Sequence, residues 1–257
     1  RVTCDIHKFA KLYISPIDGK IVTDSGGYSF IKGDIPPVKL PEMIDCYSVY
    51  TESEREIFDY IFSLDIPISL NYPKFNTVSN ILSANKKSNM VTRELLDKYP
   101  SLQDKFYFVW HFKIKEQFAI WKHLYAELEM DRFVCNHAIG GLVGLKKAAK
   151  IDFAPFVGIS FYILNRYWHG LHAGKTLRLH YLGVYTEADR FIIAFLEKLL
   201  KSYLENVADV VATYDSINFV HTVRMNAQVP LYAFDGNGFK IFPSLLDAPM
   251  EILREVA

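Results

Sequence analysis

The stretch from Lys20 to Tyr28 reads K-I-V-T-D-S-G-G-Y and indicates how the chain is built. Its β-branched start predicts a short buried strand that ends at Asp24. The glycine pair after Ser25 predicts a turn at which the backbone can come close to another group. Taken alone, an ordinary strand-to-loop turn would explain these residues equally well.

Two later segments repeat the pattern of a strand that ends in an aspartate. F-S-L-D-I-P at residues 62–67 carries Asp65, and V-V-A-T-Y-D-S at residues 210–216 carries Asp215. The carboxyl ends of parallel strands meet at one edge of a sheet or one mouth of a barrel. The sequence therefore predicts that three carboxylates face a common site.

Strands and helices alternate along most of the chain. Strands are expected to end near Asp24, Asp65, Phe112, Ile139, Val184 and Asp215, with a weaker strand signal from Phe9 to Ser15. Helices are expected from Thr51, over Val91–Tyr99, Lys115–Met130, Asp152–Gly170 and Thr186–Glu205, whereas the proline-rich residues 33–41 are expected to form a loop.

This alternation predicts an α/β fold with a parallel sheet, and the fold class that we expect is a (β/α)8 TIM-type barrel. Six strands leave such a barrel two short, so either the given sequence begins inside the barrel, or residues are missing, or the barrel is unusual. We expect residues 1–225 to form the barrel. Residues 226–257 are expected to add a β-hairpin, at Val229–Pro243, and a helix that pack on it.

Composition limits the classes of function. The chain has 257 residues, 50% of them hydrophobic, and its formal net charge is zero, so any basic footprint for a nucleic acid must be local. No apolar run is long enough to span a bilayer, which argues against a membrane partner. The three cysteines, Cys4, Cys46 and Cys135, are widely spaced, and we expect them to be reduced thiols of a cytoplasmic protein.

Five short motifs in one order resemble the tRNA-guanine transglycosylase superfamily, whose members exchange guanine in a nucleic acid for a 7-deazaguanine base. The resemblance covers about residues 20–216. Its motifs are T-D-S-G-G-Y at 23–28, L-D-I-P at 64–67, I-G-G-L at 139–142, H-Y-L-G-V at 180–184 and Y-D-S at 214–216.

The resemblance implies a role for each matching residue. Asp215 matches the nucleophile that attacks C1′ of the sugar, and Asp24 matches the group that handles the proton of the base. Asp65 matches the carboxylate that accepts hydrogen bonds from the guanine edge. Ser25, Gly141 and Leu142 match residues that line the base pocket. Tyr28 and Leu182 match the two residues that sandwich the base.

Departures from the family pattern bear on the substrate. Val109-Trp110-His111 stands where the family has Val-Gln-Gly, so Trp110 or His111 is a candidate for contact with the base or nucleotide, although a tryptophan in a buried strand is more often core. The cysteines of the zinc site found in tRNA members are absent after Cys135, and the anticodon-binding loop is missing. These losses favour DNA over tRNA as the partner, and we expect no metal and no cofactor.

Basic residues in three segments are candidates for phosphate contacts, with solvated surface as the ordinary alternative. The residues are Lys86, Lys87, Lys146, Lys147 and Arg224.

Three functions stay open at this point. A base-exchange enzyme acting on DNA or tRNA and on a free 7-deazaguanine base fits the motifs best. A retaining glycoside or nucleoside hydrolase would use the same pair of carboxylates. A non-catalytic subunit that binds nucleic acid is the third, and the presence of both Asp24 and Asp215 argues against it. The sequence does not decide whether the protein forms oligomers or needs accessory subunits.

Overall fold

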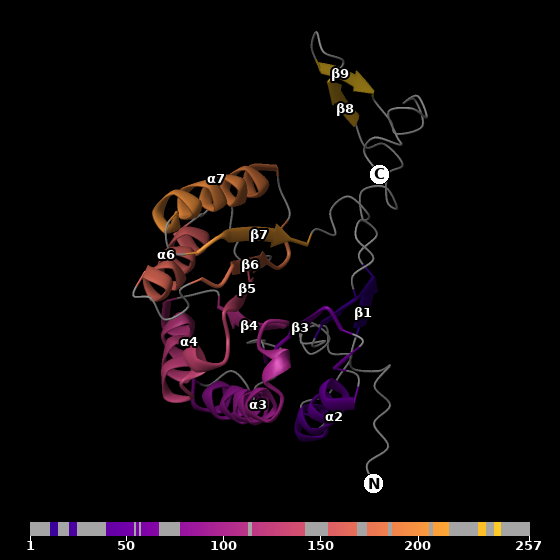
Figure 1. Ribbon diagram of the computed structural model, residues 1–257, viewed down its shortest axis with the longest axis vertical. Coiled ribbons are helices and arrows are strands. Elements are labelled where there is room, and N and C mark those ends of the chain that lie inside the picture. The colour runs from indigo at the N-terminus through magenta and orange to yellow at the C-terminus, as the bar shows by residue number, and fades with distance from the viewer. Residues whose placement is uncertain are drawn as a thin grey trace.

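The computed structural model describes residues 11–14, 21–24, 40–53, 55–56, 58–66, 78–112, 115–141, 154–168, 174–184, 187–205, 208–215, 231–234 and 239–242. Within the strands at 11–14, 21–24, 231–234 and 239–242 the description covers the backbone alone. Figure 1 shows these segments as ribbons.

Seven strands form one sheet in the order of the sequence, β1-β2-β3-β4-β5-β6-β7. Five parallel pairings join β2 to β7, and β1 pairs with β2 in the antiparallel direction. The strands are β1 (Lys11–Ile14), β2 (Ile21–Asp24), β3 (Tyr60–Phe62), β4 (Phe106–His111), β5 (Asn136–Gly140), β6 (Leu177–Tyr181) and β7 (Val210–Tyr214). The expected α/β fold with a parallel sheet is therefore confirmed.

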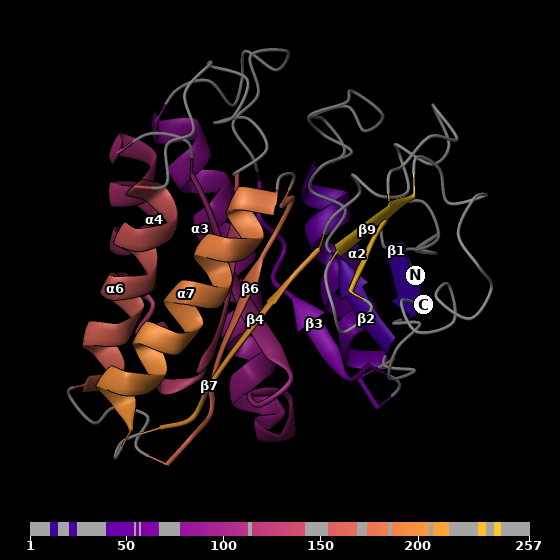
Figure 2. The same cartoon turned by 90° about the horizontal axis from the view of Figure 1, so that it is seen from above.

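Helices connect the parallel strands. They are α2 (Leu40–Ser53), α3 (Val78–Lys98), α4 (Lys115–Glu127), α6 (Ala154–Trp168) and α7 (Glu187–Leu204), with short 3-10 turns η4 (Pro100–Leu102) and η5 (Met130–Arg132). Because each strand lies next to its predecessor in one direction, crossovers of one hand place their helices on one face of the sheet. Figures 1 and 2 show α3, α4, α6 and α7 along one side of the strands, in an arc around them.

The main core lies between this helical layer and the sheet. Alternate strand residues such as Ile61, Phe108, Ile139 and Leu179 point to the helices and are almost fully buried. The other face of the sheet carries a smaller apolar cluster of Phe62, Tyr107, Val109 and Ala138, against which Tyr60 and Leu182 pack. The period of two along each strand thus gives the sheet a helix-covered face and an inner face.

Two helix predictions differ from the structure. The segment at Thr51 is the end of α2 and not the start of a helix, because apolar residues at helical spacing, Met43, Ile44 and Tyr47, already bury one face before it. Pro41 is compatible with this helix because proline is tolerated in a first turn. The helix predicted from Val91 begins at Val78. Its first half was not recognised because several of its buried residues are polar and interrupt the apolar periodicity.

The helix expected within residues 226–257 lies outside the described residues. The other strand and helix predictions are confirmed, most with ends that differ by a few residues. These include β1 in the weak opening segment and the hairpin formed by β8 (Leu231–Phe234) and β9 (Phe239–Phe242). The described strands of the main sheet include no pairing between β7 and β1 or β2, so the pairings themselves describe an open sheet.

Candidate functional site

Four strands bring predicted site residues to the carboxyl edge of the sheet. His111 on β4 pairs with Gly140 on β5. The pairing continues past the strand ends, since the Leu182 amide donates to the Ile139 carbonyl at 2.9 Å and the Asp215 amide donates to the Tyr181 carbonyl at 3.2 Å. His111, Gly140, Leu182 and Asp215 therefore stand in one row on the inner face of the sheet.

Asp65 joins this row through His111. It follows β3 and its carboxylate Oδ2 lies 2.5 Å from Nδ1 of the His111 ring. The two side chains are 9% and 13% exposed, respectively, so the pair is largely shielded from solvent. An imidazole that donates its Nδ1–H to a carboxylate is held in one orientation and one tautomer.

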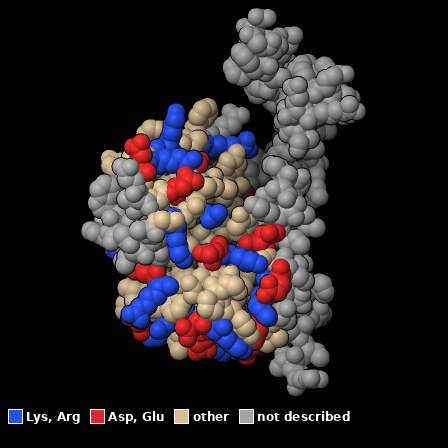
Figure 3. Space-filling view, in the orientation of Figure 1, with Lys and Arg blue, Asp and Glu red and all other residues tan. Residues whose placement is uncertain are grey.

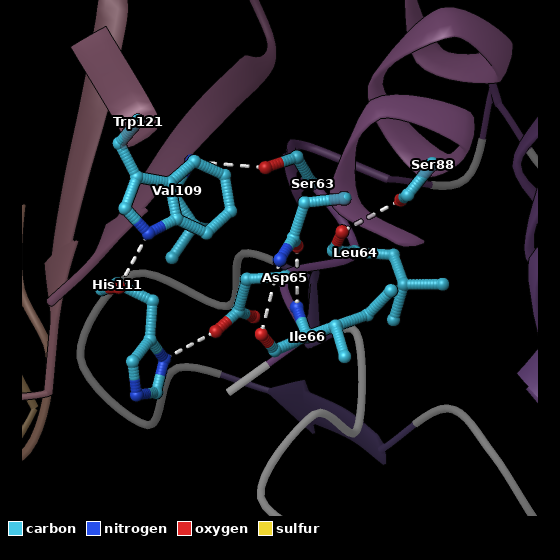
Figure 4. Close-up of polar contacts among 9 residues, drawn as sticks. Ser63, Leu64, Asp65, Ile66, Ser88, Val109, His111 and Trp121 are labelled. Carbon is cyan, nitrogen blue, oxygen red and sulfur yellow. Dashed lines mark hydrogen bonds and ion pairs between the residues drawn. The ribbon is translucent and has the colours of Figure 1, made fainter. Parts of the chain in front are cut away.

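The backbone on both sides of Asp65 is held by helix α3. The Asn85 side chain accepts from the Ile66 amide at 2.9 Å and donates to the Ile66 carbonyl at 3.2 Å, and the Ser88 hydroxyl donates to the Leu64 carbonyl at 2.7 Å. Figure 4 shows these contacts flanking Asp65 and its bond to His111. Asn85 and Ser88, here called the α3 clamp, are buried. They restrict where the carboxylate can point.

His111 is fixed as well. The Trp121 indole of α4 donates to the His111 carbonyl, as Figure 4 shows. A Cβ at Gly140 would lie 3.3 Å from the His111 Nδ1, so the missing side chain leaves room for the ring. The second ring nitrogen, Nε2, is buried and has no hydrogen-bond partner among the residues that the structure describes.

Gly141 forms the turn after β5. Its φ is +82°, and a Cβ there would collide with the carbonyl oxygen of Phe112. Only glycine meets both conditions without strain. The predicted Gly-Gly turn is therefore required by the backbone, and its approach to Phe112 brings the ends of β4 and β5 together beside His111.

Asp215 stands at the opposite end of the row. Its Oδ1 accepts from the Gly183 amide, and its carbonyl accepts from the Val184 amide at 3.0 Å. Surrounding protein atoms raise the pKa of this carboxyl above its usual value, and the Gly183 hydrogen bond opposes that rise. Gly183 has a φ of +73°, which turns its amide toward the carboxylate.

Aromatic side chains line the inner face below the row. The ring of Phe62 lies 5.2 Å from that of Tyr107 and 5.0 Å from that of His180. The His180 Nδ1 lies 2.9 Å from the Thr213 hydroxyl. Burial lowers the pKa of His180 to about 4, so this imidazole is neutral at neutral pH. Leu182 packs against the same cluster and is partly exposed, a position compatible with contact to a flat ligand.

The remaining predicted residues differ in how far the structure describes them. Asp24 ends β2, and continuing the printed register places it opposite Phe62 on β3. The other predicted positions lie outside the described residues, and they are Ser25, Tyr28, Leu142, Lys146, Lys147 and Arg224.

Trp110 points away from the row, which contradicts the contact with a nucleotide considered for it. It is fully buried on the helix-covered face, its indole donates to His137 Nδ1 at 3.2 Å, and its ring centroid lies 4.9 Å from that of Tyr125. Strand alternation explains the result, because neighbouring residues face opposite sides and His111 takes the inner one.

Of the candidate phosphate contacts, the two that the structure describes, Lys86 and Lys87, lie in the helical layer. Lys86 forms an ion pair with Glu127 of α4, and the Lys87 Nζ lies 3.9 Å from the Asp45 carboxylate of α2. On the face in Figure 3, Lys and Arg side chains are interspersed with Asp and Glu. Helix-to-helix pairing accounts for both lysines without a phosphate.

Other chemistry is limited within the described part of the chain. No group of three His, Cys, Asp or Glu side chains gathers there in a way that could hold a metal ion. None of the helices described combines the length and apolar character needed to cross a bilayer. Cys135 is a free buried thiol whose pKa is raised by burial, whereas Cys46 is disulfide-bonded, so the expectation of three reduced cysteines is wrong for Cys46.

The Asp65–His111 pair and the α3 clamp were missed by the sequence motifs. A histidine where the resembling family has a glycine, next to a strand end, was the available signal for the pair. Buried Asn85 and Ser88 looked like loop residues because polar side chains broke the apolar periodicity of α3.

Comparisons with models of known protein families, with curated proteins and with solved structures found no match.

Proposed function

We propose that this chain is a guanine base-exchange enzyme, which replaces guanine in a nucleic acid, preferentially DNA, with a 7-deazaguanine base. The observation that carries the proposal is the shared edge of Asp65, the Gly140–Gly141 turn, Leu182 and Asp215, which come from four strands in the order of the resembling motifs. A carboxylate that accepts from a purine edge, a glycine turn and a covalent nucleophile would then meet in one place.

The position of Asp24 supports a barrel in which it faces Asp215. Following the pairings across the sheet from Asp24 leads to Val211, four residues before Asp215; the intermediate positions are Phe62, Tyr107, Asn136 and Arg178. In a barrel whose strands tilt by about 36°, five strand spacings of about 4.8 Å lower that row by about 14 Å along the axis. Four residues along the strand recover about 11 Å.

The offset therefore brings Asp24 and Asp215 to within about one residue of the same height in such a barrel. In a flat sheet the strands are not tilted, so nothing would compensate for the four residues that separate Asp215 from the row containing Asp24 and Val211. The matching heights of Asp24 and Asp215 favour a TIM-type barrel with β1 antiparallel at its edge, in which the two carboxylates lie across one mouth.

The proposed chemistry uses two half-reactions. The Asp215 carboxylate attacks C1′, the bond between C1′ and the base breaks, and Asp24 protonates the departing guanine. The incoming base then attacks C1′, the sugar ester on Asp215 breaks, and Asp24 takes the proton of that base. The hydrogen bond from Gly183 to Asp215 supports the ionised, nucleophilic form against the desolvation that disfavours it.

A retaining nucleoside hydrolase is the second candidate, and the Asp65–His111 pair favours it. A carboxylate-held imidazole is a common arrangement for activating water. In that reaction water, and not a second base, would attack the sugar ester.

The test supplies purified protein with radiolabelled guanine and either duplex DNA or tRNA. We expect label to enter DNA more than tRNA, and Asp215→Asn to abolish uptake. Release of unlabelled guanine from the polymer without uptake of label would identify the hydrolase. Neither uptake nor release would refute both enzymatic functions.

A further inference from the structure

We propose that His111 is the residue that sets ligand specificity in this site, and that its Nε2 atom accepts a hydrogen bond from an N–H group of the bound base. Asp65 acts on this atom from the other side of the ring as a positioning residue. The inference rests on the proposed base-exchange function for the identity of the ligand, whereas the state of the ring can be tested without it.

First, the contact with Asp65 determines which tautomer the His111 ring adopts. Asp65 Oδ2 lies 2.5 Å from Nδ1, and an ionised carboxylate can only accept, so the proton of a neutral imidazole belongs on Nδ1. Nε2 is then a lone-pair acceptor.

The second step is that nothing in the described protein satisfies this acceptor. The α3 clamp holds Asp65, Trp121 holds the His111 backbone, and Gly140 leaves space beside the ring. Nε2 is therefore a buried acceptor without a partner among the residues described, on a ring that is held in place. A donor from outside the described protein is required to remove the cost of that unmatched atom.

The third step is the class of ligand. His111 lies on the inner face in the same row as Gly140, Leu182 and Asp215. A ligand held there that supplies a donor to Nε2 must carry N–H or O–H groups on a flat edge, as guanine does with its ring N–H and amino group. A base that presents only acceptors at this position would place one lone pair against another and would be rejected.

Two variants separate contact with the ligand from contact with Asp65. In His111→Asn the amide reaches about as far as Nδ1 and keeps a partner for Asp65, whereas in His111→Gln the longer side chain carries its amide to about the position of Nε2. If Nε2 meets the base, His111→Asn will bind guanine about tenfold more weakly than wild type, and His111→Gln within about threefold. The reverse order would overturn the proposal and leave His111 as a support for Asp65.

Nitrogen NMR of protein labelled with 15N-histidine provides the second readout. In the free protein we expect the His111 signal of an Nδ1-protonated ring with an unprotonated Nε2, and addition of guanine should move the Nε2 signal more than the Nδ1 signal. A proton on Nε2 in the free protein would refute the tautomer. A guanine-bound protein whose Nε2 signal stays in place would show that ordered water alone meets this atom, which also refutes the proposal.

The same experiments distinguish failure of the inference from failure of the proposed function. If wild-type protein binds no guanine, the base-exchange function and the specificity role assigned to His111 both fall, whereas the histidine spectrum still decides the tautomer and the positioning role of Asp65. If guanine binds but the two variants lose affinity equally, the function stands and the specific role of Nε2 is refuted.

Discussion

At the scale of single residues, Gly141 shows how one backbone position can determine a site. Its positive φ and its approach to the Phe112 carbonyl exclude any side chain. The sequence predicted a turn there, and the tight contact depends on β4, which lies beside β5 in the sheet but about 25 residues earlier in the sequence. The local sequence pattern therefore identified the glycine, but only the packing of the strands explains why no other residue fits there.

Gly141→Ala should lower the free energy of unfolding by about 1–3 kcal/mol, because alanine is strained at this φ and its methyl group meets backbone that cannot rotate away. The matched control is Gly158→Ala on α6, where a Cβ would meet nothing within 4 Å and should stabilise the helix by about 0.5–1 kcal/mol. Urea unfolding of both variants gives the comparison. Equal stability of Gly141→Ala and wild type would mean that this turn is not built as described.

Asp215 is the other residue whose surroundings have a measurable consequence. Nearby protein atoms raise the pKa of its carboxyl although the residue is solvent-exposed, so the folded protein binds this proton somewhat more tightly than the unfolded chain does. Where the folded state holds more protons, stability falls as pH rises. Ionised Asp215 thus costs stability at neutral pH, as a nucleophile kept for reactivity would.

Asp215→Asn should therefore be slightly more stable than wild type at pH 7, because solvent screens an exposed carboxylate, with the difference shrinking as pH falls toward the ordinary carboxyl pKa. The asparagine oxygen can still accept from the Gly183 amide, so that hydrogen bond is preserved. Thermal unfolding of both proteins across this pH range measures the effect. A difference that does not change with pH would show that the carboxyl is not desolvated in the folded protein.

At the scale of elements, α3 explains why sequence reasoning succeeded in part. The parallel strands were predictable because several, such as β4 and β7, are short β-branched or aromatic runs with few competing interpretations. The predicted helix was shorter than α3 because Asn85, Ser88, Asn89 and Thr92 are buried at positions where apolar residues are expected. Two of these side chains bind the backbone around Asp65, and such contacts between distant segments leave no periodic signal in the sequence.

Asn85→Ala should destabilise the protein by about 2–4 kcal/mol, because it leaves the buried amide and carbonyl of Ile66 without partners. Asn89→Ala is the matched control on the same helix, since Asn89 is equally buried but its side-chain atoms have no hydrogen-bond partner among the described residues. It should cost clearly less.

Asn85→Ala should also weaken guanine binding if Asp65 has the proposed role. Unfolding and binding measured on the same preparations separate the two effects. If Asn85→Ala and Asn89→Ala cost equal stability, the α3 clamp does not hold the segment that carries Asp65.

At the scale of the whole molecule, the order of strands was predictable and the closure of the sheet was not. Alternating strands and helices require adjacent parallel neighbours, and the structure has them from β2 to β7. Whether the first and last strands meet depends on tilt and on pairings made far apart in sequence, which composition and periodicity do not encode. The antiparallel β1 shows the limit, because nothing in its four residues indicates its direction.

Closure can be tested through the two carboxylate positions. In an eight-stranded barrel with spacing of about 4.8 Å and tilt of about 36°, β2 and β7 lie about 14 Å apart across the mouth, whereas the same strands in a flat sheet are about 24 Å apart. Nitroxide labels on Asp24→Cys and Asp215→Cys, in a protein whose other reactive thiols have been blocked or replaced, should therefore show strong dipolar broadening of the EPR spectrum. Each singly labelled variant supplies the unbroadened reference.

Broadening for the doubly labelled protein and not for the singly labelled references would place Asp24 and Asp215 at one mouth, close enough for a sugar and its base to lie between them. Spectra without this broadening would mean an open sheet. Asp24 could not then donate a proton to a base whose sugar is bound to Asp215, and the two half-reactions would need another acid.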